Sequence, residues 1–189
     1  MKIEYYYGIP SPFAYLGSER LQSMAKKYNK EIIEKPCDLV GGIFTKTGGL
    51  PVPQRSPQRQ KYRLDELKRW SNFLDIKINL KPKFFPPKDP HISSKYIIAA
   101  NLLGVKLVFG HVLLKQVWNE EKDISDEKNI ETVSNLFKLN FKELSELAKS
   151  DKVSKIYHEN TEEAVTKNIF GSPTYIYNNE LFWGQDRLD

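Results

Sequence analysis

The sequence contains a single cysteine, Cys37, among its 189 residues. One thiol can form neither an internal disulfide nor a Cys-X-X-Cys redox motif, which excludes a disulfide-stapled fold and suits a reducing cytoplasm. Cys37 follows Pro36 and lies away from any expected helix start. We therefore expect a small buried apolar residue at this position, and no nucleophile.

Long apolar runs and metal-ligand spacings are missing as well. No run approaches the roughly 20 apolar residues that span a membrane, and Glu4 among the first tyrosines does not fit the start of a signal peptide. The histidines His91, His111 and His158 show no His-X-X-X-His spacing. We therefore expect a cytoplasmic protein without a membrane segment or a metal site.

No segment of the chain carries a dense run of like charges. The net charge of +5 is modest, and the basic stretch from Arg55 to Arg69 is interrupted by Asp65 and Glu66. A solvated helix face is therefore a better interpretation of this stretch than a nucleic-acid interface. Hydrophobic residues at 40% and aromatic residues at 12% favour one compact globular unit. The core is expected to hold the three tryptophans, Trp70, Trp118 and Trp183.

The first part of the chain follows a strand, helix, strand order. Short aromatic or apolar runs predict strands over Lys2–Tyr7 and Glu31–Lys35, and helical spacing of apolar residues predicts a helix over Phe13–Tyr28. This is a βαβ unit with parallel strands. From Pro36 to Pro57, paired glycines and three prolines exclude a long regular element. A binding loop or lid is the preferred interpretation of this segment, and disorder is the alternative.

The remainder is predicted to be helical until a final hairpin. Ser56-Pro57 opens a helix that ends near Asp75, and the proline- and aromatic-rich segment 82–90 is expected to pack against the body of the protein. Apolar residues three or four apart predict further helices at 93–103, 105–119, 126–138, 140–149 and 152–168. Short strands over Thr174–Tyr177 and Leu181–Trp183 are joined by Asn178-Asn179, which suits a tight antiparallel turn.

Motifs near the two ends of the chain resemble those of a known family. Ser11-Pro12-Phe13-Ala14 lies at the first strand-to-helix junction, Phe170-Gly171-Ser172-Pro173-Thr174 enters the hairpin, and Trp183-Gly184-Gln185-Asp186-Arg187 follows it. Together they resemble the 2-hydroxychromene-2-carboxylate isomerase family. That family is similar to kappa-class glutathione transferases and, more distantly, to DsbA-like thioredoxin-fold proteins. The resemblance spans nearly the whole chain, and the closing motif is its most specific part.

The element order matches an α/β thioredoxin-like fold, βαβ followed later by αββ, with a large all-helical insertion between the two halves. We expect a split thioredoxin-like domain formed by residues 1–56 and 152–189. The helical insertion domain is then formed by residues 57–151.

Ser11 has two interpretations. On the residues alone, its hydroxyl caps the following helix, and Pro12 suits the first helical turn. Alternatively, a hydroxyl at the positive end of a helix stabilises a thiolate or another anion. DsbA-like redox enzymes carry Cys-X-X-Cys here, whereas this chain has Ser11 and Ala14, so disulfide exchange at this site is excluded. The resemblance implies that Ser11 is the catalytic residue and bonds the thiol of glutathione.

The resemblance also implies a glutathione site. Ser172 and Pro173 correspond to the family's cis-proline position, whose backbone pairs with glutathione like an added strand. Gln185 and Asp186 match the positions that hold the γ-glutamyl end, with Asp186 pairing its amino group. On the residues alone, Ser172-Pro173 is an ordinary loop, and Asp186 caps a helix or pairs with Arg187.

Three features depart from the family pattern. Arg59 stands where a lysine usually holds the glycyl carboxylate, and arginine binds a carboxylate in a bidentate way. Gly49 falls where kappa-class proteins place a glutathione-binding asparagine, so that only a backbone contact is available there. The family normally continues into a last helix that covers the sheet, whereas this sequence stops at Asp189. Truncation or a second subunit would explain this, and we expect a homodimer.

The preferred function is that of a cytoplasmic, glutathione-dependent isomerase acting on an unsaturated aromatic acid of the 2-hydroxychromene-2-carboxylate type. The resemblance implies that glutathione thiolate, held by Ser11, adds to an electron-poor carbon before ring opening, rotation and elimination. The expected partners are glutathione, a small aromatic substrate and a second copy of the chain, with no nucleic acid or membrane. The alternatives are a kappa-like transferase or peroxidase, and a non-catalytic glutathione- or peptide-binding module.

Overall fold

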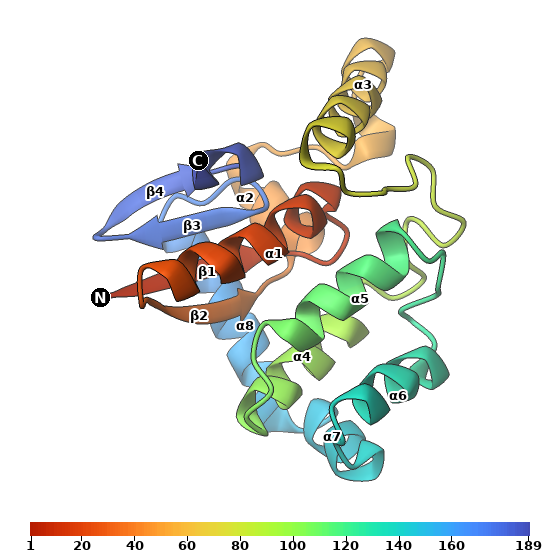
Figure 1. Cartoon of the computed structure of the whole chain (residues 1–189), viewed down its shortest axis with the longest axis vertical. Coiled ribbons are helices and arrows are strands. Elements are labelled where there is room, and N and C mark those ends of the chain that lie inside the picture. The colour runs from red at the N-terminus through yellow and green to blue at the C-terminus, as the bar shows by residue number, and fades with distance from the viewer.

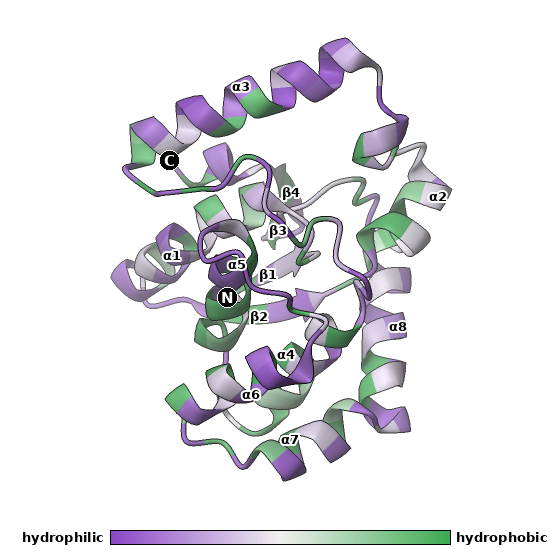
Figure 2. Cartoon of the chain, turned by 90° about the vertical axis from the view of Figure 1, so that its right-hand side faces the viewer, coloured by the Kyte–Doolittle hydropathy of each residue, from purple (hydrophilic) through white to green (hydrophobic).

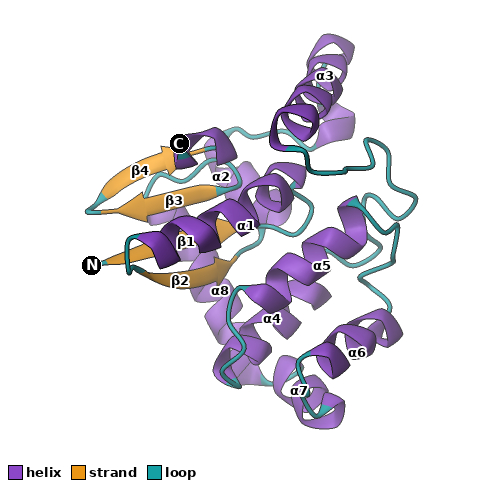
Figure 3. Ribbon diagram, viewed as in Figure 1, coloured by secondary structure: helices purple, strands orange, loops and turns teal.

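A four-stranded mixed sheet with the strand order β2-β1-β3-β4 forms one side of the molecule (Figures 1 and 3). This computed structural model describes residues 1–189. The strands are β1 (Lys2–Tyr7), β2 (Glu31–Pro36), β3 (Thr174–Tyr177) and β4 (Glu180–Trp183). β1 pairs in parallel with β2 and antiparallel with β3, and β3 pairs antiparallel with β4. The predicted βαβ unit and C-terminal hairpin are both confirmed.

Helices surround the sheet and extend beyond it. Their bounds are α1 (Pro12–Lys27), α2 (Thr45–Thr47), α3 (Pro57–Leu74), α4 (Ile92–Leu102), α5 (Val108–Trp118), α6 (Glu127–Leu136), α7 (Phe141–Ala148) and α8 (Asp151–Thr166). α1 and α8 cover opposite faces of the sheet, and α4 to α7 form a helical block beside β2 (Figures 1 and 2). α3 stands apart from that block and is mainly hydrophilic (Figure 2). None of the helices combines the length and apolar character that crossing a membrane requires.

The helical block and the sheet share one hydrophobic core. Tyr5 of β1 and Leu16 of α1 belong to the same buried cluster as Ile97 of α4 and Trp118 of α5. The helical segment therefore depends on the sheet for part of its burial. The domain bounds at 57–151 stay a prediction.

The start of α5 is set by a contact from the sheet. The helix begins at Val108, three residues later than its predicted start, because Leu107 adopts a positive φ of 59°. The Leu107 N–H donates to a carboxylate oxygen of Glu34 on β2 at 3.0 Å, and the Tyr7 hydroxyl donates to the other oxygen at 2.6 Å. This shared carboxylate joins the helical block to β1 and β2.

The segment between β2 and α3 has more structure than the sequence predicts. It contains a π-helical turn over Leu39–Phe44, the single turn α2, and a 3-10 turn over Val52–Gln54. Asp38 begins the first turn, since its carboxylate accepts a hydrogen bond from the Gly41 N–H at 2.9 Å. No long regular element forms here, as predicted, and side-chain caps hold short helical turns between the glycines and prolines. The role of this segment as a binding loop stays a prediction.

Candidate functional site

Ser11 lies at the junction of β1 and α1 and is only 4% exposed. Its Oγ accepts a hydrogen bond from the Ala14 N–H at 3.2 Å and donates one to the Ser172 carbonyl oxygen at 2.9 Å. A hydroxyl has one proton and two lone pairs, so one lone pair of Ser11 is uncommitted. Ser11 is thus a helix cap, and its oxygen still has room for one further partner.

The Ser172-Pro173 peptide bond is cis, as predicted. The Ser172 Oγ accepts a hydrogen bond from the Gly8 N–H at 3.1 Å, and the Pro173 carbonyl accepts one from the Gly184 N–H at 3.0 Å. The half-buried Ser172 makes no hydrogen bond through its own backbone N–H. An unpaired backbone donor therefore lies beside Ser11, where an extended peptide could accept from it.

Gln185 and Asp186 follow Gly184, which has a φ of 108° that favours glycine. The Gln185 side chain is 1% exposed, and its Oε1 accepts a hydrogen bond from Arg20 of α1 at 2.7 Å. Its Nε2 is buried without a partner. Asp186 is partly exposed and forms an ion pair with Arg187 at 2.7 Å. Gln185 is thus held against α1, whereas the Asp186 carboxylate is accessible to a ligand.

Arg59 is not bonded to these residues. It is exposed on the first turn of α3, and its side chain forms no ion pair or hydrogen bond. The structure thus brings Ser11, Ser172 and Pro173 into contact and joins Gln185-Asp186 to them through Gly184. No hydrogen bond or ion pair joins Arg59 to this group. The proposed ligand roles of all six residues stay predictions.

The Phe44 ring leaves no room for a side chain at position 49. A Cβ at position 49 would overlap the Phe44 ring, so the space of the asparagine expected from the kappa-class pattern is filled by this ring. The Arg55 guanidinium lies over the same ring, 5.9 Å from its centre, and Arg55 Nε donates to the Leu50 carbonyl at 2.8 Å. Burial and the neighbouring Arg59 lower the pKa of Arg55. The loop is therefore built around an aromatic ring and a cation, which the sequence did not indicate.

Three further residues near the Ser11 junction were not predicted as site residues. The Trp118 ring is fully buried, and its Nε1 donates to the carbonyl of Ile9 at 3.4 Å. Phe85 packs against Trp118 with ring centres 4.9 Å apart, and the Arg63 guanidinium lies 5.8 Å from both ring centres. A sequence signal existed, because Arg63 precedes the buried Leu67 by four residues and shares its helix face.

Trp183 is not in the core, contrary to the expectation for the three tryptophans. Trp118 is in the core and Trp70 is half-buried, but Trp183 on the edge strand β4 is 52% exposed. It packs edge-to-face on Phe170 with ring centres 4.8 Å apart, and its indole covers Gly171. The exposed aromatic pair therefore lies against the residue that precedes Ser172.

Cys37 is buried, as expected, and its surroundings disfavour a role as a nucleophile. Its Sγ donates to the Tyr7 carbonyl at 3.5 Å, and burial raises the pKa of the thiol to about 12. The thiolate, which is the reactive form, is therefore suppressed at neutral pH. The chain offers no other thiol for sulfur chemistry.

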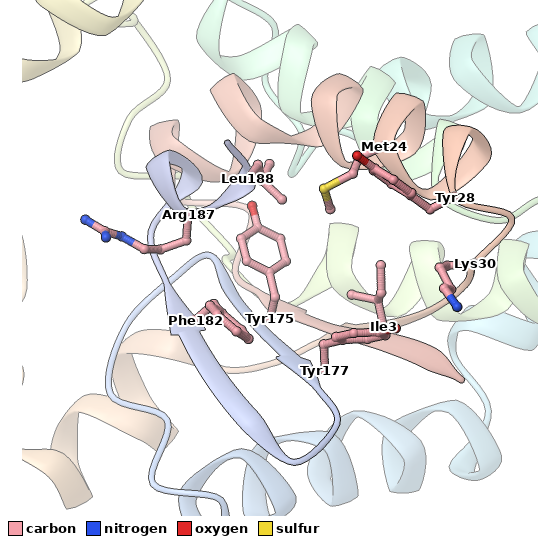
Figure 4. A pocket seen from close by; sticks show the side chains of 9 residues that line it. All are labelled: Ile3, Met24, Tyr28, Lys30, Tyr175, Tyr177, Phe182, Arg187 and Leu188. Atoms are coloured by element: carbon pink, nitrogen blue, oxygen red, sulfur yellow. The ribbon is translucent and has the colours of Figure 1, made fainter.

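An apolar groove lies between α1 and the sheet, toward the C-terminal end of α1 (Figure 4). Its cavity volume is about 330 Å³. Met24, Tyr28, Tyr177, Phe182 and Leu188 contribute apolar side chains, and Lys30 and Arg187 contribute the two charged ones. The groove uses none of the residues at the Ser11 junction. The homodimer expected from the sequence stays a prediction.

Comparison with known proteins agrees with this fold. The family model of the DSBA-like thioredoxin domain matches residues 2–189. The 2-hydroxychromene-2-carboxylate isomerase of Pseudomonas putida is 25% identical over 197 residues, which cover 100% of this chain and 91% of the relative. Glutathione S-transferase kappa 1 of Caenorhabditis elegans is 23% identical over 198 residues, which cover 99% of this chain and 87% of the relative.

A solved structure of 2-hydroxychromene-2-carboxylate isomerase superposes on the protein with a TM-score of 0.81 at 22% identity. The superposition covers 100% of this chain and 91% of that chain. The predicted family resemblance and the predicted thioredoxin-like fold are both confirmed.

Proposed function

The chain belongs to the family of DSBA-like thioredoxin domains, and we propose that it is a glutathione-dependent isomerase of an unsaturated aromatic acid of the 2-hydroxychromene-2-carboxylate type. The observation that carries the proposal is the Ser11 junction. A capped hydroxyl lies there beside the unpaired Ser172 N–H, while the chain's own thiol, Cys37, is buried elsewhere. A site of this kind that performs sulfur chemistry needs a thiol from outside.

The residues present fit a bound glutathione. The Ser172 N–H is a free donor for a peptide carbonyl, and the accessible Asp186 carboxylate suits an ammonium group. Arg59 is an unpaired cation suited to the glycyl carboxylate at the far end of the tripeptide. When bound, glutathione supplies the thiolate that attacks the substrate. The chain's own residues orient the tripeptide and favour the ionised form of its sulfur.

Ser11 and the start of α1 favour that ionised form. Ser11 Oγ is a short polar group at the N-terminus of a helix of 16 residues, where the helix dipole stabilises negative charge. Pro12 lacks an N–H, the Ala14 N–H is bonded to Ser11, and the Phe13 N–H makes no hydrogen bond. The Phe13 N–H is therefore a free donor that can face a sulfur at this junction. The Ser11 hydroxyl can become a second donor when its proton leaves the Ser172 carbonyl.

A kappa-like transferase is the second candidate, because the kappa-class relative is nearly as similar as the isomerases. Both activities use the same thiolate and differ in the acceptor. A transferase releases a conjugate, whereas an isomerase returns glutathione unchanged.

Two measurements test the proposal. Calorimetry is expected to detect glutathione binding, and chromatography with 2-hydroxychromene-2-carboxylate is expected to detect an isomer without loss of glutathione. A stable conjugate with a neutral electrophile, and no isomer, would favour the transferase. Binding without either product would leave a non-catalytic module, and no binding at millimolar glutathione would remove all three.

A further inference from the structure

Arg63 of α3 is a half-buried arginine without an anionic partner. Its guanidinium forms no ion pair and no hydrogen bond, and it lies 5.8 Å from the ring centres of both Phe85 and Trp118. Arg69 differs, because it pairs with Glu66 on the surface of the same helix at 2.6 Å. Arg63 is thus a cation held against aromatic rings with its donors unused.

Such an arrangement is costly without a ligand. A guanidinium has five N–H donors, and removing them from water without hydrogen bonds is unfavourable. Contact with the two rings offsets only part of this cost. Burial, helped by repulsion from Arg55, lowers the pKa of Arg63 to about 10, and no acidic side chain opposes that shift. An anion at this position would satisfy the donors and relieve the repulsion.

Arg63 also lies on the side of α3 that faces the Ser11 junction. It shares a helix face with the fully buried Leu67, and α3 packs against α1. The Trp118 ring beneath it bonds the Ile9 carbonyl at 3.4 Å. Ile9 lies in the tight turn that is closed by the hydrogen bond from the Ser11 N–H to the Gly8 carbonyl at 3.0 Å. Arg63 is therefore connected to the turn that precedes Ser11 through the Trp118 ring.

We propose that Arg63 binds the carboxylate of the acid substrate in a bidentate way and so makes the site selective for anionic over neutral acceptors. This inference rests on the proposed function, because it assigns the acceptor side of the same site. Arg59, one turn earlier on α3 and exposed, remains the cation assigned to the glycyl carboxylate of glutathione. Arg63 has no counterpart role in a transferase of neutral electrophiles, for which an unpaired cation beside the acceptor would be unfavourable.

The test compares an acid with its neutral ester. Chromone-2-carboxylate is an unreactive analogue of the proposed substrate, and its ethyl ester has the same ring without the charge. Calorimetry with the wild type, Arg63→Met, Arg63→Lys and Lys68→Met gives the affinities. Lys68→Met is the matched control, because it removes one cation from an exposed position of the same helix. Circular dichroism and thermal melting report the folding of each variant.

We expect the wild type to bind the acid more tightly than the ester. Arg63→Met should lose about 10- to 100-fold in affinity for the acid, the range for a hydrogen bond to a charged group, and should bind the ester as the wild type does. Arg63→Lys should bind the acid with intermediate affinity, because it keeps the charge and loses the bidentate geometry. Lys68→Met should match the wild type for both ligands.

Equal wild-type affinities for the acid and the ester would overturn the inference, as would undiminished acid binding by Arg63→Met. If Arg63→Met does not fold, the ratio of acid to ester affinity in Arg63→Lys decides: an unchanged ratio overturns the inference, and a reduced ratio supports it. Glutathione binding is measured separately in the same proteins. Loss of glutathione binding with Arg63-dependent acid binding would refute the proposed function alone, and the converse would refute the role of Arg63 alone.

Discussion

Replacing Ser11 with alanine separates the two roles of this residue. The hydroxyl accepts from the Ala14 N–H and donates to the Ser172 carbonyl, so Ser11→Ala removes a helix cap and a link between distant segments. Loss of an N-cap costs about 0.5 to 2 kcal/mol of stability. In the proposed function the variant also removes the donor to the glutathione sulfur. A hydrogen bond to a charged group contributes about 1.5 to 3 kcal/mol, which corresponds to a rise of about one to two units in the thiol pKa.

The expected result is a fall in turnover at neutral pH of about 10- to 100-fold, because the fraction of bound thiolate falls by one power of ten for each unit of pKa. Glutathione affinity should change less, since Asp186 and Arg59 hold the two ends of the tripeptide in the proposed site. Thiolate absorbance of bound glutathione, followed against pH, measures the shift directly. The titration of Ser11→Ala should move to higher pH than that of the wild type.

Ser150 provides the matched control. Its Oγ accepts from the Val153 N–H at 3.3 Å and donates to the Leu147 carbonyl at 2.6 Å, so it caps α8 much as Ser11 caps α1. Ser150→Ala should lose a similar amount of stability and keep its turnover. Coincident thiolate titrations for Ser11→Ala and the wild type would refute the role of the hydroxyl. An equal loss of turnover in Ser150→Ala would show that the effect comes from stability.

Three further predictions concern binding, assembly and pH. Asp186→Asn should weaken glutathione more than an analogue without the γ-glutamyl amine in calorimetry, and equal losses would count against the assigned pairing. Light scattering should give about twice the 22.0 kDa of one chain, because the apolar groove of Figure 4 is accessible on a single copy, and a stable monomer would contradict this. Burial of Glu163 opposes its ionisation, but hydrogen bonds from Lys167 and Lys35 outweigh it and hold its pKa at about 2. A carboxylate with a lowered pKa adds stability that is lost as the pH falls from about 4.5 toward 2, so Glu163→Gln should lower Tm at pH 7 and much less at pH 2. Equal losses of Tm at both pH values would exclude this linkage.

The elements predicted correctly are those whose signals are local. Ser11-Pro12 and Ser56-Pro57 mark helix starts, because the serine caps the helix and proline suits its first turn. Asn178 and Asn179 adopt φ values of 51° and 64°, which asparagine tolerates in a hairpin turn. Helix ends agree with the predictions to within a few residues wherever apolar spacing is regular.

The structure differs from the prediction, or adds to it, where distant residues decide the local conformation. Val108 begins α5 because Glu34, far away in the sequence, binds the Leu107 N–H. The turns between β2 and α3 are held in part by Thr161 of α8, whose hydroxyl accepts from the Asp38 N–H at 3.0 Å. The sequence of that segment shows its glycines and prolines, but it does not show which distant residues bind to it.

The same contrast between local and distant signals applies to the candidate site. The residues alone leave Ser11 as a cap, and only the family resemblance connects it to Ser172, which is 161 residues away and bonded to it in the structure. Arg63 was missed for a different reason. Charged residues on a helix are usually solvated, and the aromatic rings that cover Arg63 come from a proline-rich connector and from α5.

The Ser11 hydroxyl donates its proton to the Ser172 carbonyl in the structure. This hydrogen bond determines when Ser11 can donate to a bound sulfur. Ser11 can donate to a sulfur only when another donor replaces it at that carbonyl, since a buried carbonyl oxygen is rarely left unpaired. A peptide lying in extended form along Ser172 accepts from its N–H and donates to its carbonyl, as an added strand does. Occupation of the peptide position would thus release the Ser11 hydroxyl for the thiol of the same ligand. A small thiol without a peptide backbone leaves the Ser11–Ser172 bond in place. Such thiols should therefore support little turnover even at concentrations that saturate the enzyme.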